Sequence, residues 1–211
     1  MNRRSFLAGG GTLAALAPAA VVHQSSARSA GPRDAEPRAQ YFRQDGPEWF
    51  TNVRLRTHDG RTVRFYDDLL EGKIILVNFF FTSCDGICPL MTDNLVRVQE
   101  LLGPRVGRDI FMYTISLQPI FDTPEILRAY ADSRGVRPGW LFLTGEPSDV
   151  ELLRGRLGFV DSDPVLDADL EQHIGSVRVA NEPLHRWAMS AALADPEVIV
   201  RTVSRVIPGG L

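Results

Sequence analysis

The sequence predicts an α/β domain built around a parallel sheet. Strand-like runs alternate with helix-like segments from Ile74 to Leu157, which is the order of right-handed βαβ crossovers. The last third changes to two short extended segments and one helix. The composition, with 44% hydrophobic and 23% charged residues and a net charge of −3, is that of a globular domain without the basic surface that nucleic-acid binding requires.

A β-hairpin is expected first. Apolar and polar residues alternate from Val53 to Phe65 around Asp59-Gly60, a dipeptide typical of tight hairpin turns. His58 is therefore expected at a solvent-exposed hairpin tip, as a turn residue rather than a ligand.

The central strand and helix come next. Residues 74–81 form a nearly unbroken β-branched and aromatic run, which predicts a strand buried on both faces. Pro89 suits the first position of a helix that ends at Leu102, before Gly103-Pro104.

The remaining elements follow from caps, stops and periodicity. Thr123 and Asp195 are expected helix caps, each followed by proline, and Gly135 and Gly158 are expected helix stops. The predicted strands cover 110–117, 140–143, 174–180 and 184–190, and the predicted helices cover 124–134, 148–157 and 196–206. A β-α-β core followed by a β-β-α end is the layout of a thioredoxin-like three-layer sandwich, here with an N-terminal β-hairpin extension.

Both cysteines of the chain lie in the loop between the central strand and helix. This loop is at the carboxyl end of the strand, where open α/β sheets place their chemistry. Cys88 precedes Pro89 and is expected to cap the helix, where the helix dipole would lower its pKa. Two buried apolar cysteines or a small structural disulfide are the alternatives. A bridge between Cys84 and Cys88 closes so short a loop that it would stabilise the chain little, which favours a functional pair.

A third ligand can be sought among the four histidines. Two thiolates and an imidazole suit Cu(I), whereas zinc usually takes a fourth ligand. If residues 174–180 run antiparallel to the central strand, His173 lies beside the cysteines and His185 lies about 20 Å away at the opposite edge. His23 belongs to the N-terminal leader and His58 to the hairpin. The alternative is that His173 only caps its strand or pairs with a nearby acid.

The N-terminus resembles an export signal. Arg3 and Arg4 precede a weakly apolar run, 8–22, that is interrupted by glycine and proline, as in twin-arginine signals. The protein is therefore expected to be exported, either periplasmic or tethered to the outer face of the cytoplasmic membrane, with membrane association through the N-terminus. The expected parts are a signal or anchor, a linker and the folded domain, at 1–30, 31–48 and 49–211.

The segment F-F-F-T-S-C-D-G-I-C-P-L-M-T, Phe79 to Thr92, resembles the signature of the Sco/SenC family, copper proteins of respiratory oxidase assembly. The segments that begin at Asp122 and Pro138, and Gln172-His173 ahead of a strand, agree with that family.

The resemblance implies one copper, as Cu(I) and/or Cu(II), bound through Cys84, Cys88 and His173. It implies delivery of that copper to the dinuclear site of cytochrome c oxidase subunit II, with an upstream copper donor and a thiol reductant as further partners. Asp85 and Gln118 stand where many members carry proline and aspartate.

The enzyme assignment stays open. In the alternative function, a thiol-disulfide oxidoreductase, Cys84 attacks a target disulfide and Cys88 resolves the mixed disulfide, so that the two cysteines are a catalytic redox pair. A peroxidase of similar fold is a third alternative.

Overall fold

The computed structural model describes residues 50–170 and 175–211. Contacts divide the chain into units 1–41 and 42–211, and all described residues belong to the second unit. The expected leader and linker, and His173 with its neighbours in 171–174, lie outside the described residues. Within the described part, no helix is both long and apolar enough to cross a bilayer.

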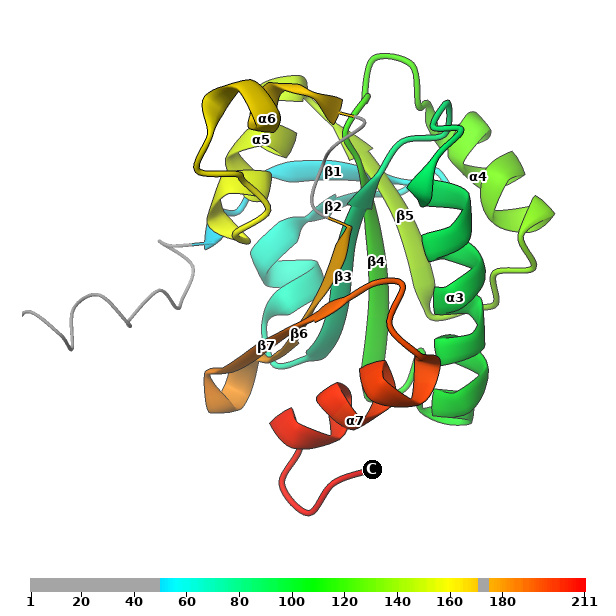
Figure 1. Cartoon of the computed structure of the whole chain (residues 1–211), viewed down its shortest axis with the longest axis vertical. Coiled ribbons are helices and arrows are strands. Elements are labelled where there is room, and N and C mark those ends of the chain that lie inside the picture. Colours follow the sequence, from blue (N-terminus) through cyan, green and yellow to red (C-terminus); the bar gives the residue numbers. More distant parts are fainter. Residues whose placement is uncertain (1–49, 171–174) are drawn as a thin grey trace, which may run out of the picture. The chain divides into compact units, whose positions relative to one another are not determined.

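A single mixed sheet forms the middle layer of the domain (Figure 1). Its strand order is β2-β1-β5-β4-β3-β6-β7. Strands β3, β4 and β5 are parallel, whereas the β1–β2 hairpin and the β6–β7 pair join them antiparallel on either side. The strands are β1 Arg54–Thr57, β2 Thr62–Arg64, β3 Ile74–Phe80, β4 Ile110–Ser116, β5 Trp140–Gly145, β6 Ser176–Asn181 and β7 Arg186–Ala191.

Helices cover both faces of this sheet and complete the three layers. Helices α3, α4 and α7 pack on one face, whereas η1 and α5 pack on the other, where they contact buried side chains of the hairpin strands. The helical segments are η1 Phe65–Leu70, α3 Ile87–Leu102, η2 Gly103–Arg105, α4 Pro124–Ser133, α5 Pro147–Arg156, α6 Pro164–Ala168, η4 Glu182–Leu184 and α7 Pro196–Val206. The predicted thioredoxin-like sandwich with a hairpin extension is confirmed.

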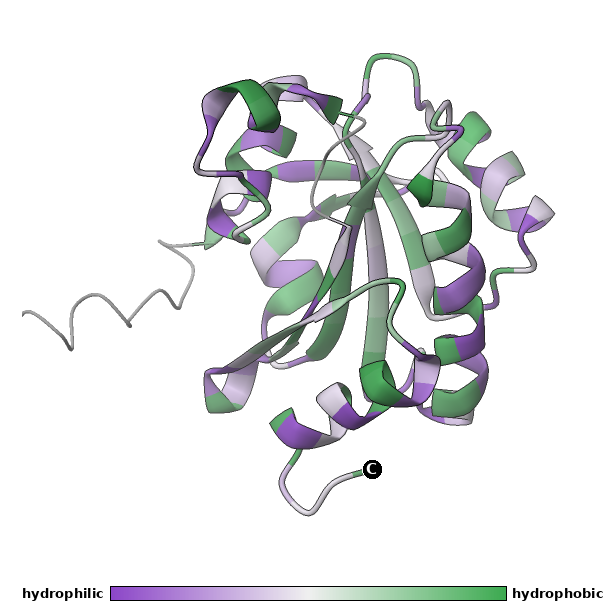
Figure 2. Ribbon diagram, viewed as in Figure 1, coloured by the Kyte–Doolittle hydropathy of each residue, from purple (hydrophilic) through white to green (hydrophobic). Residues whose placement is uncertain are grey.

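Strand β3 is apolar on both sides because both sides are covered. Leu76 and Phe80 face the α3 layer, and Ile75, Val77 and Phe79 face the η1 layer. Figure 2 shows the apolar central strands beside helices of mixed polarity.

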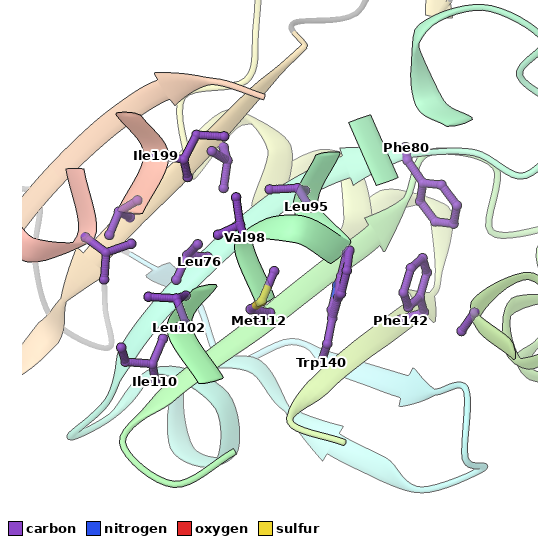
Figure 3. Packing of buried hydrophobic residues seen from close by; sticks show 14 of the residues in the cluster. Leu76, Phe80, Leu95, Val98, Leu102, Ile110, Met112, Trp140, Phe142 and Ile199 are labelled. Carbon is purple, nitrogen blue, oxygen red and sulfur yellow. The ribbon is translucent and has the colours of Figure 1, made fainter. Parts of the chain in front are cut away.

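In Figure 3, Val98 of α3 lies with Leu76 and Trp140 in the part of the core between the sheet and helices α3, α4 and α7. The indole of Trp140 donates to the Thr114 hydroxyl at 2.8 Å, so this large buried side chain also has its polar atom paired.

The hairpin tip differs from the prediction. His58 is a turn residue, as expected, but it is half-buried against β5. Its Nδ1 accepts from the Phe142 amide at 3.0 Å, and its carbonyl accepts from Arg128 Nε at 3.0 Å. Burial lowers the pKa of His58. The imidazole therefore fastens the hairpin to the sheet.

Candidate metal centre

The two cysteines lie together at the carboxyl end of β3. Cys84 is 8% exposed, Cys88 is fully buried, and both are free thiols. Their side chains are hydrogen-bonded to one another. The structure thus confirms that the loop brings the two sulfurs to one place, where a single metal ion can contact both.

The start of α3 corrects the predicted environment of Cys88. The helix begins at Ile87 with Gly86 as its N-cap, so Cys88 is the second helical residue and Pro89 the third. The prediction that Cys88 caps the helix is wrong. The predicted fall in its pKa is wrong too: burial raises the pKa of Cys88 to about 12, because loss of solvation outweighs the backbone hydrogen bonds that favour the thiolate.

A buried carboxylate holds the thiol loop in place. Asp122, in the β4–α4 loop, is 1% exposed and accepts from the Thr82 amide at 3.2 Å, from the Thr82 hydroxyl and from the Ser116 hydroxyl at 2.5 Å. Sequence reasoning recognised the segment that begins at Asp122 but assigned no role to this side chain. The detectable signal was an acid immediately before a Thr-Pro helix cap.

Two further contacts fix the backbone beside the sulfurs. The Ser83 hydroxyl donates to Gln118 Oε1 at 2.9 Å, which ties the loop to the end of β4. The Thr92 hydroxyl donates to the Cys88 carbonyl at 2.9 Å and lies 3.1 Å from the Tyr130 hydroxyl. The cysteines are therefore held by α3, α4 and the β4–α4 loop together.

Strand β6 begins at the same edge of the sheet as the cysteines. It pairs antiparallel with β3 in a register that sets Ile74 opposite Asn181 and Val77 opposite Arg178. The expected direction of this strand is confirmed. His185 follows η4 at the far end of the β6–β7 pair, which is the opposite edge from the cysteines, as predicted.

Position 175 is packed against the first turn of α3. A Cβ atom added to Gly175 would lie 2.6 Å from Ile87 Cδ1 and 3.5 Å from Met91 Sδ. A side chain at position 175 would require the end of the Ile87 side chain to move, so the backbone here lies close to the helix that carries Cys88.

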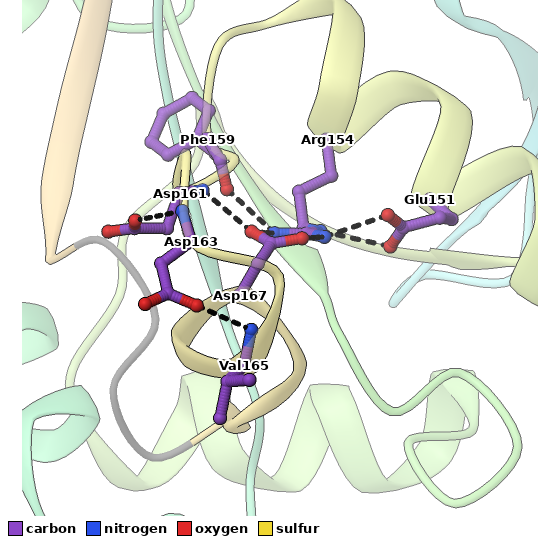
Figure 4. Close-up of polar contacts among 7 residues, drawn as sticks. All are labelled: Glu151, Arg154, Phe159, Asp161, Asp163, Val165 and Asp167. Carbon is purple, nitrogen blue, oxygen red and sulfur yellow. Dashed lines mark hydrogen bonds and ion pairs between the residues drawn. The ribbon is translucent and has the colours of Figure 1, made fainter.

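The chain before residue 171 is anchored by a buried arginine (Figure 4). Arg154 of α5 has an 8% exposed side chain that pairs with Glu151 at 2.7 Å and Asp167 at 2.5 Å and donates to the Phe159 carbonyl at 2.9 Å. Arg154 lowers the pKa of Asp167 to about 2. These bonds hold α6 against α5.

A complete three-ligand cluster is not found in the described chain. Among residues 50–170 and 175–211, no three His, Cys, Asp or Glu side chains are grouped so that they could hold a metal. The described residues therefore bring together two sulfur atoms, those of Cys84 and Cys88, as candidate ligands.

Exposed apolar side chains flank the thiol loop. Ile120 and Phe121 are 74% and 68% exposed and lie between the two residues, Gln118 and Asp122, that bond the loop. Leu90, in the first turn of α3, is 59% exposed. Such a group of exposed apolar side chains is typical of a contact surface.

The family model SCO1/SenC matches residues 45–206. The chain belongs to the SCO1/SenC family. A SCO2-like protein of Rickettsia prowazekii is 33% identical over 87 residues, which make up 41% of this chain and 41% of that protein. The matched part is thus less than half the length of this curated relative.

Solved structures of SCO1/SenC proteins share the fold. Copper-bound ScoI of Bradyrhizobium japonicum superimposes with a TM-score of 0.58 at 22% identity, covering 73% of this chain and 96% of that one. BsSco, a member of the Sco family of cytochrome c oxidase assembly proteins in which a disulfide switch is identified, superimposes with a TM-score of 0.59 at 23% identity, covering 73% and 90%.

Proposed function

We propose that this SCO1/SenC protein is a copper metallochaperone that binds one copper through Cys84, Cys88 and His173. The observation that carries the proposal is the pair of free, hydrogen-bonded thiols at the carboxyl end of β3. Two sulfurs and one imidazole are a ligand set for a soft metal, above all Cu(I). The copper bound to ScoI of Bradyrhizobium japonicum supports this choice of metal.

The anchoring of Gly175 supports His173 as the third ligand. Two residues span at most about 7 Å between Cα atoms. Because a Cβ atom at position 175 would lie 2.6 Å from Ile87 Cδ1, this chain length supports the proposal that the imidazole of His173 reaches the turn that carries Cys88. The Arg154 contacts hold Asp167 of α6, a few residues before residue 171.

Copper capture requires the loss of thiol protons. Burial raises the pKa of Cys88 to about 12, so the free protein holds a neutral thiol there at neutral pH. A metal that binds the thiolate must displace this proton, and copper affinity should fall as pH falls. Oxidation of Cys84 and Cys88 to a disulfide would remove both sulfur ligands, which makes redox state a gate on capture.

The proposed destination of the copper is the dinuclear site of cytochrome c oxidase subunit II. The membership of BsSco in a family of oxidase assembly proteins supports this. Transfer needs a partner whose own ligands replace Cys84, Cys88 and His173 in turn, and the exposed Ile120 and Phe121 offer it a surface beside the thiols. An upstream copper donor and a thiol reductant complete the proposed partners.

The proposed location is outside the cytoplasm. Arg3 and Arg4 before a weakly apolar run support export, with the N-terminus as the point of membrane association. We keep the expected division into a signal or anchor at 1–30, a linker at 31–48 and the thioredoxin-like domain at 49–211.

A thiol-disulfide oxidoreductase is the second candidate, because Cys84 is the more exposed of two adjacent thiols. The Cys84 thiolate would attack a target disulfide, form a mixed disulfide and release one target thiol. Cys88 would then attack Cys84, release the second thiol and leave the Cys84–Cys88 disulfide. The disulfide switch of BsSco supports this chemistry.

One pair of variants separates the candidates. His173→Ala should abolish stable copper binding by the reduced protein while the rate of disulfide exchange with a model disulfide stays within a few-fold of wild type. His185→Ala, at the other end of the β6–β7 pair, is the matched control and should change neither. Equal loss of copper binding and disulfide exchange in His173→Ala would contradict the chaperone assignment.

A further inference from the structure

A cleft lies at the end of the sheet away from the cysteines. Its volume is about 930 Å³, and its walls are the β1–β2 hairpin, η1, and the amino-terminal halves of β4 and β5. Cys84 and Cys88 follow the carboxyl end of β3 and take no part in it. Clefts of roughly 300–1,000 Å³ hold small organic ligands, so this one has the size of a binding site.

The floor of the cleft is apolar except for one phenol. Val63 and Leu69 are buried, and Phe111 and Leu141 are half-buried. Tyr113 is 2% exposed and lines the cleft.

The Tyr113 hydroxyl makes no hydrogen bond to any residue that the structure describes. Because Tyr113 lines the cleft, its hydroxyl is available to an acceptor atom of a ligand bound there.

Three cationic side chains and one acidic side chain line the cleft. Arg61, Lys73 and Arg108 line it together with one acid, Asp68. Lys73 forms no ion pair within the described part of the chain; its ammonium donates to the Glu71 carbonyl at 3.2 Å.

The other charges at the mouth are partly engaged. Arg61 pairs with Asp59 at 2.9 Å, and Arg108 lies 3.4 Å from Asp109. Asp68 accepts from the Arg64 amide at 2.6 Å, which occupies one of its oxygens. The Lys73 ammonium and the two terminal NH₂ groups of the Arg108 guanidinium are therefore the donors best placed for an incoming anion.

Two glycines bring the back wall together. A Cβ atom on Gly139 would lie 2.4 Å from the Gly107 nitrogen, and both residues have positive φ, +93° and +87°. Side chains at these positions would force the loops 104–108 and 138–139 apart and open the wall of the cleft.

We propose that this cleft is a binding site for an amphipathic organic acid. The acid group pairs with Lys73 and Arg108 at the mouth, the apolar body lies against Leu69 and Leu141, and an acceptor atom takes the hydrogen of the Tyr113 hydroxyl. The site is independent of the proposed copper centre, because the two lie at opposite ends of the sheet and share no residue.

Calorimetry on the whole protein with three probes tests the chemistry. 1-Naphthoate carries both the aromatic body and the charge, 1-naphthalenemethanol carries the body alone, and inorganic phosphate carries the charge alone. The expected Kd for 1-naphthoate is about 1 mM or below, from its size and the usual efficiency of small ligands. Each of the other two probes should bind at least tenfold more weakly. Equal binding of 1-naphthoate and either of these probes would overturn the proposal.

Variants locate the binding. Tyr113→Phe removes only the hydroxyl and should weaken 1-naphthoate binding about fivefold, whereas the melting temperature should change little because this hydroxyl bonds no described residue. Lys73→Gln combined with Arg108→Gln should weaken it at least tenfold, and Arg201→Gln, an exposed arginine of α7, should not.

A second apolar surface supplies the decisive control. Ile120→Ser combined with Phe121→Ser removes the exposed apolar side chains beside the cysteines. This variant should keep full 1-naphthoate affinity. Loss of affinity here, or unchanged affinity in the Lys73 and Arg108 double variant, would show that the probe does not occupy the cleft.

Discussion

Asp122→Asn should loosen the thiol loop without creating a cavity, because the two side chains have nearly the same size. The carboxylate of Asp122 is 1% exposed and accepts three hydrogen bonds, two from Thr82 and one from Ser116. Asparagine keeps the shape but can accept through one atom only, so it retains at most the bonds made to one oxygen. The charge is lost as well, which weakens the bonds that remain.

The expected loss of stability follows from these contacts. A hydrogen bond to a charged group contributes about 1.5–3 kcal/mol. Loss of one such bond, with the partner hydroxyl free to turn toward the new amide, predicts that the free energy of unfolding falls by about 2 kcal/mol. Asp122→Ala leaves all three donors without an acceptor and should lower it by about 4 kcal/mol.

Urea unfolding of the reduced, copper-free protein measures both variants, because midpoint and slope together give the change in unfolding free energy. Asp132→Asn on α4 replaces an exposed aspartate and should change stability by less than about 0.5 kcal/mol. The rate of Cys84 alkylation should rise in Asp122→Asn, because the loop opens more often. If Asp122→Asn is as stable as Asp132→Asn and alkylates no faster, Asp122 does not hold the loop.

Three further outcomes are expected. With iodoacetamide at pH 7, mass spectrometry should find Cys84 labelled well before Cys88, whose burial and raised pKa of about 12 keep it a thiol until the pH is far higher; equal labelling would contradict the site geometry. Arg154 holds the pKa of Asp167 at about 2, below its usual 3.8, so this ionised pair stabilises the fold above about pH 4, and the stabilisation is lost as pH falls toward 2. The stability difference between wild type and Asp167→Asn, followed by circular dichroism in acid titrations, should therefore shrink over that range, and a constant difference would contradict it. Arg154→Met should lower the unfolding free energy by about 2 kcal/mol in urea, less than for a fully buried pair because Glu151 and Asp167 are 63% and 22% exposed; a change below about 0.5 kcal/mol would count against the anchoring role.

Much of the fold could be predicted because its signals are local. The apolar run in β3 is continuous because helices cover both sides of the sheet. The Thr123 and Asp195 side chains accept from the amides of the following helices, as their positions before proline predict. The direction of β6 follows from the β-β-α order. This direction correctly predicted that His185 lies at the opposite edge of the sheet from the cysteines.

The errors concern quantities that depend on the assembled structure. The pKa of Cys88 is set by how completely helix and sheet exclude water, whereas the sequence shows only that a helix begins nearby. His58 is bonded to β5 because the hairpin joins the main sheet, a pairing that its own turn sequence does not encode.

The short helix α6 and the buried polar contacts of Arg154 and Asp122 could not be predicted from local sequence patterns either. Helix α6 has five residues and no full apolar face, and it is held mainly through Asp167 and the buried Arg154. Asp122 anchors the thiol loop from 40 residues away in the chain. Neither contact leaves a periodic pattern in the sequence.

X-ray absorption at the copper edge, on the reduced protein loaded with one equivalent of Cu(I), tests the three-ligand centre most directly. Wild type and His185→Ala should show two sulfur ligands and one nitrogen ligand per copper, and His173→Ala should lose the nitrogen while keeping the sulfurs from Cys84 and Cys88. A nitrogen ligand that persists in His173→Ala, or copper with fewer than two sulfur ligands in wild type, would contradict the proposed centre.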